Sequence, residues 1–141
     1  MFKTILVPID VNDIETAEPA LAQAVAIAQD SDSCLRLIHV RSDFPRSVME
    51  FVPPNFDAKQ FQECEDRLAD LAAGLGLPGG QVSAVVTMGS VRHEGLKEAE
   101  RIGADLIVVG AHQPSNLMYL LGSNAAAIVR HATCSVLVVR R

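Results

Sequence analysis

The sequence predicts an α/β fold: a single-domain, doubly wound sheet of five parallel strands in the order 3-2-1-4-5, with helices on both faces. Three observations lead to this prediction. The chain has 141 residues, which fits one domain of ordinary size. Its composition is 49% hydrophobic but only 4% aromatic, as expected of helices packed on a parallel sheet. Short apolar runs alternate with segments of helical spacing, so we expect one domain over residues 1–141.

The first two predicted strands flank a helix. Residues 3–9 form an apolar, β-branched run typical of a strand buried on both faces. Residues 15–29 carry apolar side chains at helical spacing, and we expect Pro19 in the first turn, where proline is tolerated. Residues 34–40 alternate and predict the second strand. Residues 42–56 contain three prolines and no period, which indicates a long connection, a candidate lid or partner surface.

Helices and strands continue to alternate in the rest of the chain. We expect Ser90 to cap the helix that follows the third strand, because its hydroxyl can accept from a free N–H group. With right-handed crossovers, the direction of winding reverses between strands one and four, and this places Asp10 and Gly110 at one crevice. The predicted elements are helices over 57–75, 90–102 and 123–131 and strands over 81–88, 105–111 and 134–140.

Charge and cysteine content exclude several classes of protein. The net charge of −5 argues against direct nucleic-acid binding, which requires a basic face. Three widely spaced cysteines indicate neither a disulfide framework nor a paired-cysteine zinc site. No run of about 18 apolar residues is present to span a membrane. The N-terminus enters a strand without the features of a signal peptide, so we expect a cytoplasmic protein.

The segment from 106 to 141 carries the clearest chemistry. Gly110 allows the backbone to approach a ligand closely, and a helix that starts at Gly122 and Ser123 offers free N–H groups to an anion such as phosphate. Asp10 can accept from a ribose hydroxyl or an adenine amine. An apolar slot for adenine can be built by Pro8, Ile9 and Val40. Each residue alone also has a structural interpretation, as a strand end, a helix cap or a turn residue.

Other motifs are interpreted as structural. Residues 74–79 satisfy the pattern GxGxxG, but they follow a helix and precede a strand, which is the reverse of a dinucleotide fingerprint. No GxxxxGK[ST] segment is present. His131 and Cys134 are too few for a metal site, and His39 and His93 are interpreted as structural. The acidic side chains of the second helix are interpreted as a solvated face: Glu63, Glu65, Asp66 and Asp70.

Several blocks in one order resemble the universal stress protein family, an adenine-nucleotide-binding α/β group. They are TILVPID at 4–10, IHV at 38–40, MGS at 88–90, ADLIVVGAH at 104–112 and LLGSNAAAIVRHATCSVLVVR at 120–140. The nucleotide-binding members carry Gly, two residues, Gly, nine residues, then Gly and Ser or Thr. Gly110, Gly122 and Ser123 fit, whereas residues 113–114 replace the middle glycine and the interval is one residue shorter. This resembles a variant loop, His-x-Pro followed by Leu-Leu-Gly-Ser-Asn, that retains nucleotide binding.

The resemblance implies a stress-response protein that binds ATP, ADP or AMP, with Mg²⁺ carried on the phosphates, and that has no catalytic residue or metal ligand of its own. It implies a homodimer through residues 135–139, or a tetramer built from it, and we expect neither nucleic-acid nor membrane binding. The implied nucleotide-binding residues are Pro8, Ile9, Asp10, Val40, Met88, Gly89, Gly110, His112, Ser115, Gly122, Ser123 and Asn124.

Two other functions remain open on the sequence. The chain could be a weak ATPase or nucleotide-transfer enzyme in which His112 or Asp10 positions the attacking water. It could also be a nucleotide-free interaction module whose residues 113–114 fill the phosphate pocket.

Overall fold

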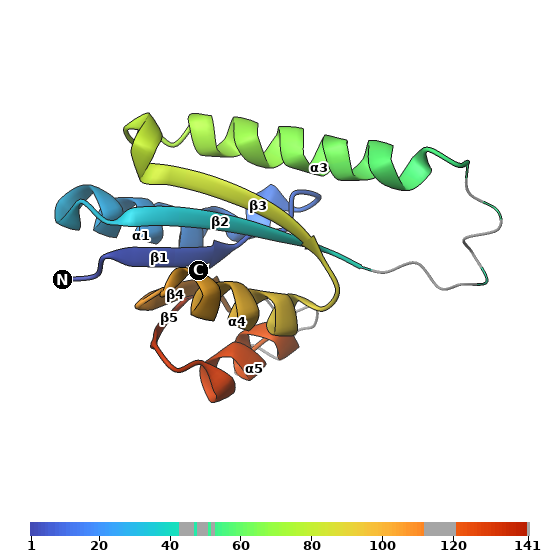
Figure 1. The fold of residues 1–141 in the computed structure, drawn as a ribbon. Coiled ribbons are helices and arrows are strands. Elements are labelled where there is room, and N and C mark those ends of the chain that lie inside the picture. The colour runs from blue at the N-terminus through green and yellow to red at the C-terminus, as the bar shows by residue number, and fades with distance from the viewer. Residues whose placement is uncertain (43–46, 48–50, 52, 112–120, 141) are drawn as a thin grey trace.

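The computed structural model describes residues 1–42, 47, 51, 53–111 and 121–140 (Figure 1). Each predicted strand and helix is confirmed, with its ends within two residues of the prediction. The segment 42–56, expected to be a lid or a partner surface, lies largely outside the described residues. The elements are β1 (Thr4–Pro8), α1 (Ile14–Ser31), β2 (Cys34–Arg41), α3 (Phe56–Ala73), the 3₁₀ helix η1 (Gly79–Gln81), β3 (Val82–Met88), α4 (Val91–Ile102), β4 (Leu106–Gly110), α5 (Ser123–His131) and β5 (Ser135–Val139).

The five strands form one parallel sheet in the order β3-β2-β1-β4-β5, which confirms the predicted topology. β1 lies between β2 and β4, and Ile5 pairs with Leu35 on one side and with Leu106 on the other. Winding therefore reverses at β1, and the carboxyl ends of β1 and β4 lie beside each other. Such a reversal is where sheets of this kind bind ligands.

Each face of the sheet carries its own core. α1 and α3 cover one face, and α4 and α5 cover the other (Figure 1). β1 contributes to both cores, because Ile5 and Val7 face α1 whereas Leu6 faces α4 and α5. Each of these three side chains has no exposed surface, and each contributes about 1.5–3 kcal/mol by burial. This two-sided burial explains why strand one shows an unbroken apolar run.

Pro19 lies in the second turn of α1, not in the first turn as expected. α1 begins at Ile14, so Pro19 is its sixth residue. A proline at this position offers no N–H group to the carbonyl of Glu15. The residues Ala20, Leu21 and Ala24, which follow the proline, are buried against the sheet, and their burial offsets the missing hydrogen bond.

Helix ends and turns follow the local sequence. Ser90 caps α4 as predicted, because its hydroxyl accepts from the N–H group of His93 at 3.2 Å. The GxGxxG segment joins the end of α3 to η1 and β3, and Gly76 has a φ of 75°, which confirms that it is a turn. No helix in the described part of the chain combines the length and apolar character that a membrane span requires.

Candidate functional site

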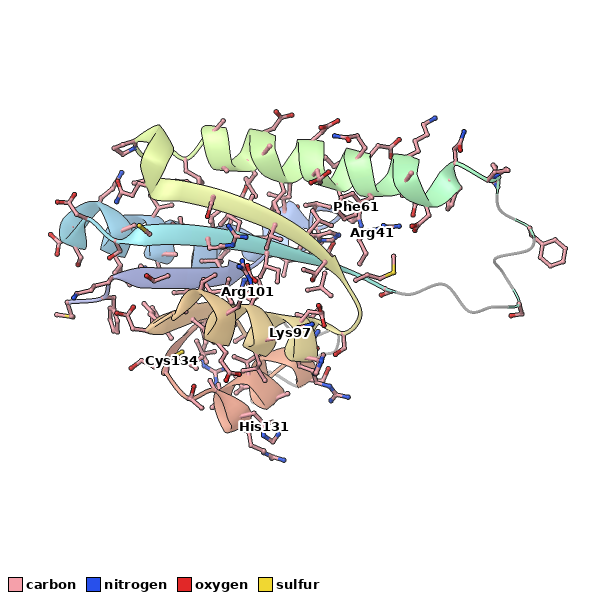
Figure 2. The ribbon with its side chains drawn as sticks, in the orientation of Figure 1. Arg41, Phe61, Lys97, Arg101, His131 and Cys134 are labelled. Carbon is pink, nitrogen blue, oxygen red and sulfur yellow. The ribbon has the colours of Figure 1, made fainter. Side chains whose placement is uncertain are left out.

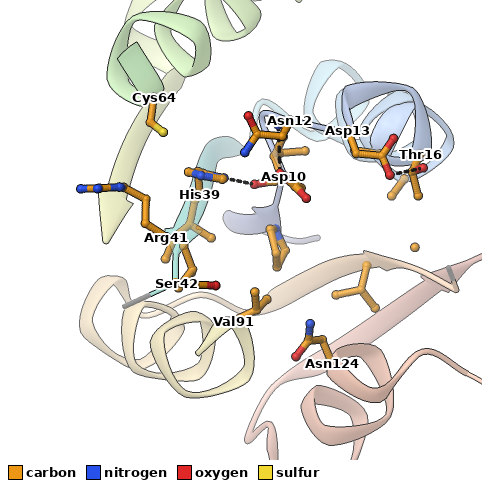
Figure 3. A pocket seen from close by; sticks show the side chains of 18 of the residues that line it. Asp10, Asn12, Asp13, Thr16, His39, Arg41, Ser42, Cys64, Val91 and Asn124 are labelled. Atoms are coloured by element: carbon orange, nitrogen blue, oxygen red, sulfur yellow. Dashed lines mark hydrogen bonds between the residues drawn. The ribbon is translucent and has the colours of Figure 1, made fainter. Parts of the chain in front are cut away.

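A cleft of about 820 Å³ opens at the carboxyl ends of the strands, within the size range of small-molecule sites (Figure 3). The ends of β1, β2 and β4 form its floor, and helices from both faces of the sheet contribute to its walls. Asp10 and Gly110 both line it, as the predicted topology required. Its lining includes Pro8, Ile9, Asp10, Asn12, Asp13, Thr16, His39, Val40, Arg41, Glu63, Arg67, Gly110, Asn124 and Ala125.

Asp10 sits in the turn between β1 and α1. Its Oδ1 accepts from the N–H group of Asn12 at 2.9 Å, and its carbonyl accepts from the N–H group of Asp13 at 3.0 Å. The residue is exposed, and Oδ2 has no recorded partner among the described residues. Asp10 is thus a turn residue and a cleft residue at once, because one carboxylate oxygen fixes the turn while the other faces solvent.

His39 holds the same turn from β2. Its Nδ1 lies 3.0 Å from the carbonyl oxygen of Ile9 and 3.3 Å from the nitrogen of Val11. A protonated Nδ1 donates to Ile9, and an unprotonated Nδ1 accepts from Val11, so either tautomer finds a partner. The ring is 5% exposed. Its structural role was expected, and its place in the cleft wall adds a polar group beside Asp10.

Arg41 is one of the lining residues that the sequence interpretation missed. Its Nη2 donates to Oδ1 of Asp57 at 2.7 Å, and its guanidinium carbon lies 5.9 Å from the centre of the Phe61 ring (Figure 2). Its Nη1 is buried and has no hydrogen-bond partner among the described residues. The predicted second strand ended at Val40, but β2 runs one residue further. The alternation of side chains along the strand, through Leu35, Leu37 and His39, would have placed residue 41 on the face of the sheet that α1 and α3 cover.

α5 presents an open N-terminus to the cleft. Gly122 is the N-cap residue and makes no side-chain cap, and Ser123 is the first helical residue. The first intrahelical bond runs from the N–H group of Ala126 to the carbonyl of Gly122 at 2.9 Å. The N–H groups of Ser123, Asn124 and Ala125 therefore have no carbonyl partner within the helix. These three groups can donate to an anion.

Two other helices start at the cleft, but each carries an acidic residue in its first turn. α1 has Glu15 there and Asp13 at its N-cap, and α4 has Glu94. α5 has none. A carboxylate in the first turn offsets the positive end of the helix dipole. Among these three helices, α5 alone has no acidic residue in its first turn to offset its positive end within the described part of the chain.

Other charged side chains line the α1 and α3 side of the cleft. Asp10, Asp13 and Glu63 are acidic, and Arg41 and Arg67 are basic. Arg67 donates from Nη1 to Oδ1 of Asn12 at 3.1 Å. Within the described ranges, no three His, Cys, Asp or Glu side chains are grouped so that they could hold a metal ion.

The structure brings together half of the twelve residues predicted for the site. Gly89 is in a tight turn with a φ of 137°, and its N–H group donates to the carbonyl of Arg41 at 2.8 Å. This positive φ angle is why the turn requires a glycine at position 89. Six predicted residues line the cleft (Pro8, Ile9, Asp10, Val40, Gly110 and Asn124), four do not (Met88, Gly89, Gly122 and Ser123), and two lie outside the described residues (His112 and Ser115).

The sequence profile of the Universal stress protein family matches residues 1–140. The chain belongs to this family. Universal stress protein G of Escherichia coli O157:H7 is 37% identical over 146 aligned residues, which cover 99% of this chain and 100% of that protein. The family resemblance drawn from the sequence blocks is thereby confirmed.

Solved structures of universal stress proteins share the fold. The protein UspA from Lactobacillus plantarum superposes with a TM-score of 0.80 at 26% identity, covering 98% of this chain and 97% of that chain. A universal stress protein from Archaeoglobus fulgidus in complex with dAMP has a TM-score of 0.69 at 16% identity, with 97% of each chain covered. At that identity the second likeness concerns the fold alone.

Proposed function

We propose that this universal stress protein binds an adenine nucleotide in the cleft and acts in the stress response as a nucleotide-dependent regulatory or interaction module. The ligand is ATP, ADP or AMP, with Mg²⁺ carried on the phosphates. The observation that carries the proposal is the open N-terminus of α5 beside Asn124 and Gly110 in a cleft of about 820 Å³.

The cleft offers a partner for each part of a nucleotide. The first N–H groups of α5, which have no carbonyl partner within the helix, suit a phosphate. Oδ2 of Asp10, which has no partner in the part of the chain that the structure describes, can accept from a ribose hydroxyl. Pro8, Ile9 and Val40 supply apolar surface for a base. Roles for Met88, Gly89, His112 and Ser115 stay predictions from the family resemblance.

The family neighbour solved with dAMP supports an adenine nucleotide in preference to another small anion. That protein has the same fold over nearly all of this chain. Binding at the helix start would order the residues around the phosphate, and this gives a surface that depends on the nucleotide.

The regulatory part of the proposal includes a homodimer through β5. β5 is an edge strand, and Leu137 on it is 36% exposed. An exposed apolar edge is prone to pair with another chain. Sedimentation should show a dimer that Leu137→Arg dissociates. Val129→Arg is the matched control, because Val129 is 45% exposed on α5 and is not part of the strand. A protein that sediments as a monomer contradicts this part.

Nucleotide binding is tested first by denaturing freshly purified protein and identifying any released nucleotide by mass spectrometry. The emptied protein is then titrated with AMP and with Mg-ATP by calorimetry. We expect a saturable isotherm with one site per chain. A flat titration by a folded protein would contradict the proposal and favour a nucleotide-free interaction module.

A pair of variants at Gly122 tests the phosphate seat. Gly122 has φ −57° and ψ 152°, a conformation that any N-cap residue adopts. Gly122→Asp and Gly122→Asn should both cap α5, so both should fold at least as stably as the native chain. Only the Asp variant adds a negative charge where the phosphate binds. We expect it to weaken nucleotide binding at least tenfold relative to the Asn variant, and equal affinities would place the phosphate elsewhere.

A further inference from the structure

The two sides of the cleft differ in charge where the phosphates are proposed to lie. α5 contributes uncompensated N–H groups on one side. The first turn of α1 lies across the cleft, with Asp13 and Thr16 opposite Asn124 (Figure 3). The carboxylate of Asp13 accepts from the hydroxyl of Thr16 at 2.7 Å through Oδ2. No basic side chain of the described residues is recorded as a partner of this carboxylate.

Thr16, which is hydrogen-bonded to Asp13, lies close to the end of β4. A Cβ atom placed on Gly110 would lie 3.9 Å from the carbonyl oxygen of Thr16. Gly110 is the last residue of β4 and lines the cleft with Asn124. Asp13 is thus on the wall that faces the space between Gly110 and α5.

The basic side chains among the described lining residues already have hydrogen-bond acceptors. The two basic lining residues, Arg41 and Arg67, belong to the end of β2 and to α3. Arg41 donates to Asp57 on α3, and Arg67 donates to Asn12 in the turn before α1. The sequence between Gly110 and Gly122 contains neither lysine nor arginine. A helix N-terminus supplies the equivalent of about half a positive charge. This charge matches one phosphate group better than three.

From this arrangement we infer that the cleft selects an adenosine nucleotide with a single phosphate over one with three, and that Asp13 is the residue that sets the preference. The inference rests on the proposed function and specifies its ligand. One phosphate is held by α5. The β- and γ-phosphates would add negative charge beside Asp13, while the two basic lining residues are already hydrogen-bonded to Asp57 and Asn12.

The preference is measured by calorimetric titration with AMP and with ATP, first without divalent metal and then with Mg²⁺. Without metal, we expect AMP to bind at least tenfold more tightly than ATP. Asp13→Asn keeps the size of the side chain and its ability to accept from Thr16, so it should fold. We expect this variant to bind AMP within twofold of the native protein and to bind ATP several-fold more tightly.

Asp70→Asn is the control for overall charge. Asp70 is exposed on α3 and is not a lining residue of the cleft, so its neutralisation raises the net charge equally. The ratio of AMP to ATP affinity should not change in this variant. An equal change in both variants would assign the effect to net charge and overturn the role of Asp13.

Three other results would overturn the inference. The first is metal-free ATP binding as tight as AMP binding. The second is an affinity ratio that Asp13→Asn leaves unchanged. The third is Mg-ATP binding that exceeds AMP binding and is lost in Asp13→Asn, because Asp13 would then hold the metal instead of repelling phosphate. Failure of both nucleotides to bind is distinct, since it contradicts the proposed function itself.

Discussion

Arg36 on β2 and Glu98 on α4 join the sheet to the helix that covers it: the Nε of Arg36 donates to Oε2 of Glu98 at 2.7 Å. Arg101 donates to both oxygens of the same carboxylate from one turn further along α4. The Glu98 side chain is 6% exposed. Its negative charge is therefore stable inside the protein only because two guanidinium groups surround it.

Glu98→Gln should lower the free energy of unfolding by about 2 kcal/mol, because the amide cannot accept from both arginines and weakens a charged pair. The measurement is urea denaturation at neutral pH. Glu100→Gln is the control on the same helix, since Glu100 is exposed, and we expect a change within about 0.5 kcal/mol. Equal effects of the two variants would show that the buried cluster adds no stability.

The contribution of Glu98 should also depend on pH. Hydrogen bonds from Arg101 and then from Arg36 lower the pKa of Glu98 below its ordinary value of 4.5, although burial opposes this. Between the lowered pKa and 4.5, the unfolded chain binds more protons than the folded chain. The stabilisation is thus complete above that ordinary value and is lost as the pH falls through the lowered pKa. The stability gap between the native chain and Glu98→Gln should shrink from about pH 7 to about pH 3.5, and a constant gap would contradict the assignment.

The fold was predictable because its signals are local. An unbroken apolar run marks a strand buried on both faces, as at residues 4–8, and spacing by three and four marks the covering helices. The cleft at Asp10 and Gly110 followed from the strand order alone. The role of a residue that depends on a partner distant in the sequence could not be predicted from such local patterns.

Arg41 and Glu98 illustrate that limit. Arg41 pairs with Asp57, sixteen positions away, across residues with no period. Glu98 lies among other charged residues on α4, and its burial depends on Arg36, which is sixty-two positions away. Both residues are charged and would be expected at the surface from their type. Only the packing of α3 and α4 on the sheet shows that they are buried.

Gly89→Ala should destabilise the protein by about 1–3 kcal/mol, because its backbone conformation is strained for any residue with a Cβ atom. The φ angle of Gly89 is 137°, and a Cβ atom there would lie 3.2 Å from Cγ of Glu94. Thermal or urea unfolding measures the loss. Gly80→Ala is the matched control, since a Cβ atom at Gly80 meets nothing within 4 Å. Comparable stability of the two variants would show that the turn after β3 relaxes without cost.

Arg41 and Asp57 should respond unequally to substitution. The Arg41 side chain is 6% exposed and its Nη1 has no partner in the described ranges, whereas the Asp57 side chain is 50% exposed and can be hydrated. Asp57→Ala leaves a buried guanidinium without its acceptor, and we expect a loss of about 3 kcal/mol. Arg41→Met removes the unpaired donor and keeps contact with the Phe61 ring, so the loss should be under about 1 kcal/mol.

The double variant completes this test. Once Arg41 is Met, removal of Asp57 leaves no buried charge, and only the interaction of that carboxylate with the N-terminal end of α3 is lost. Arg41→Met with Asp57→Ala should therefore be more stable than Asp57→Ala alone, within about 0.5 kcal/mol of Arg41→Met. Urea denaturation of the three variants measures the coupling. A double variant less stable than either single variant would mean that the two side chains act independently and that the ion pair does not hold α3 to β2.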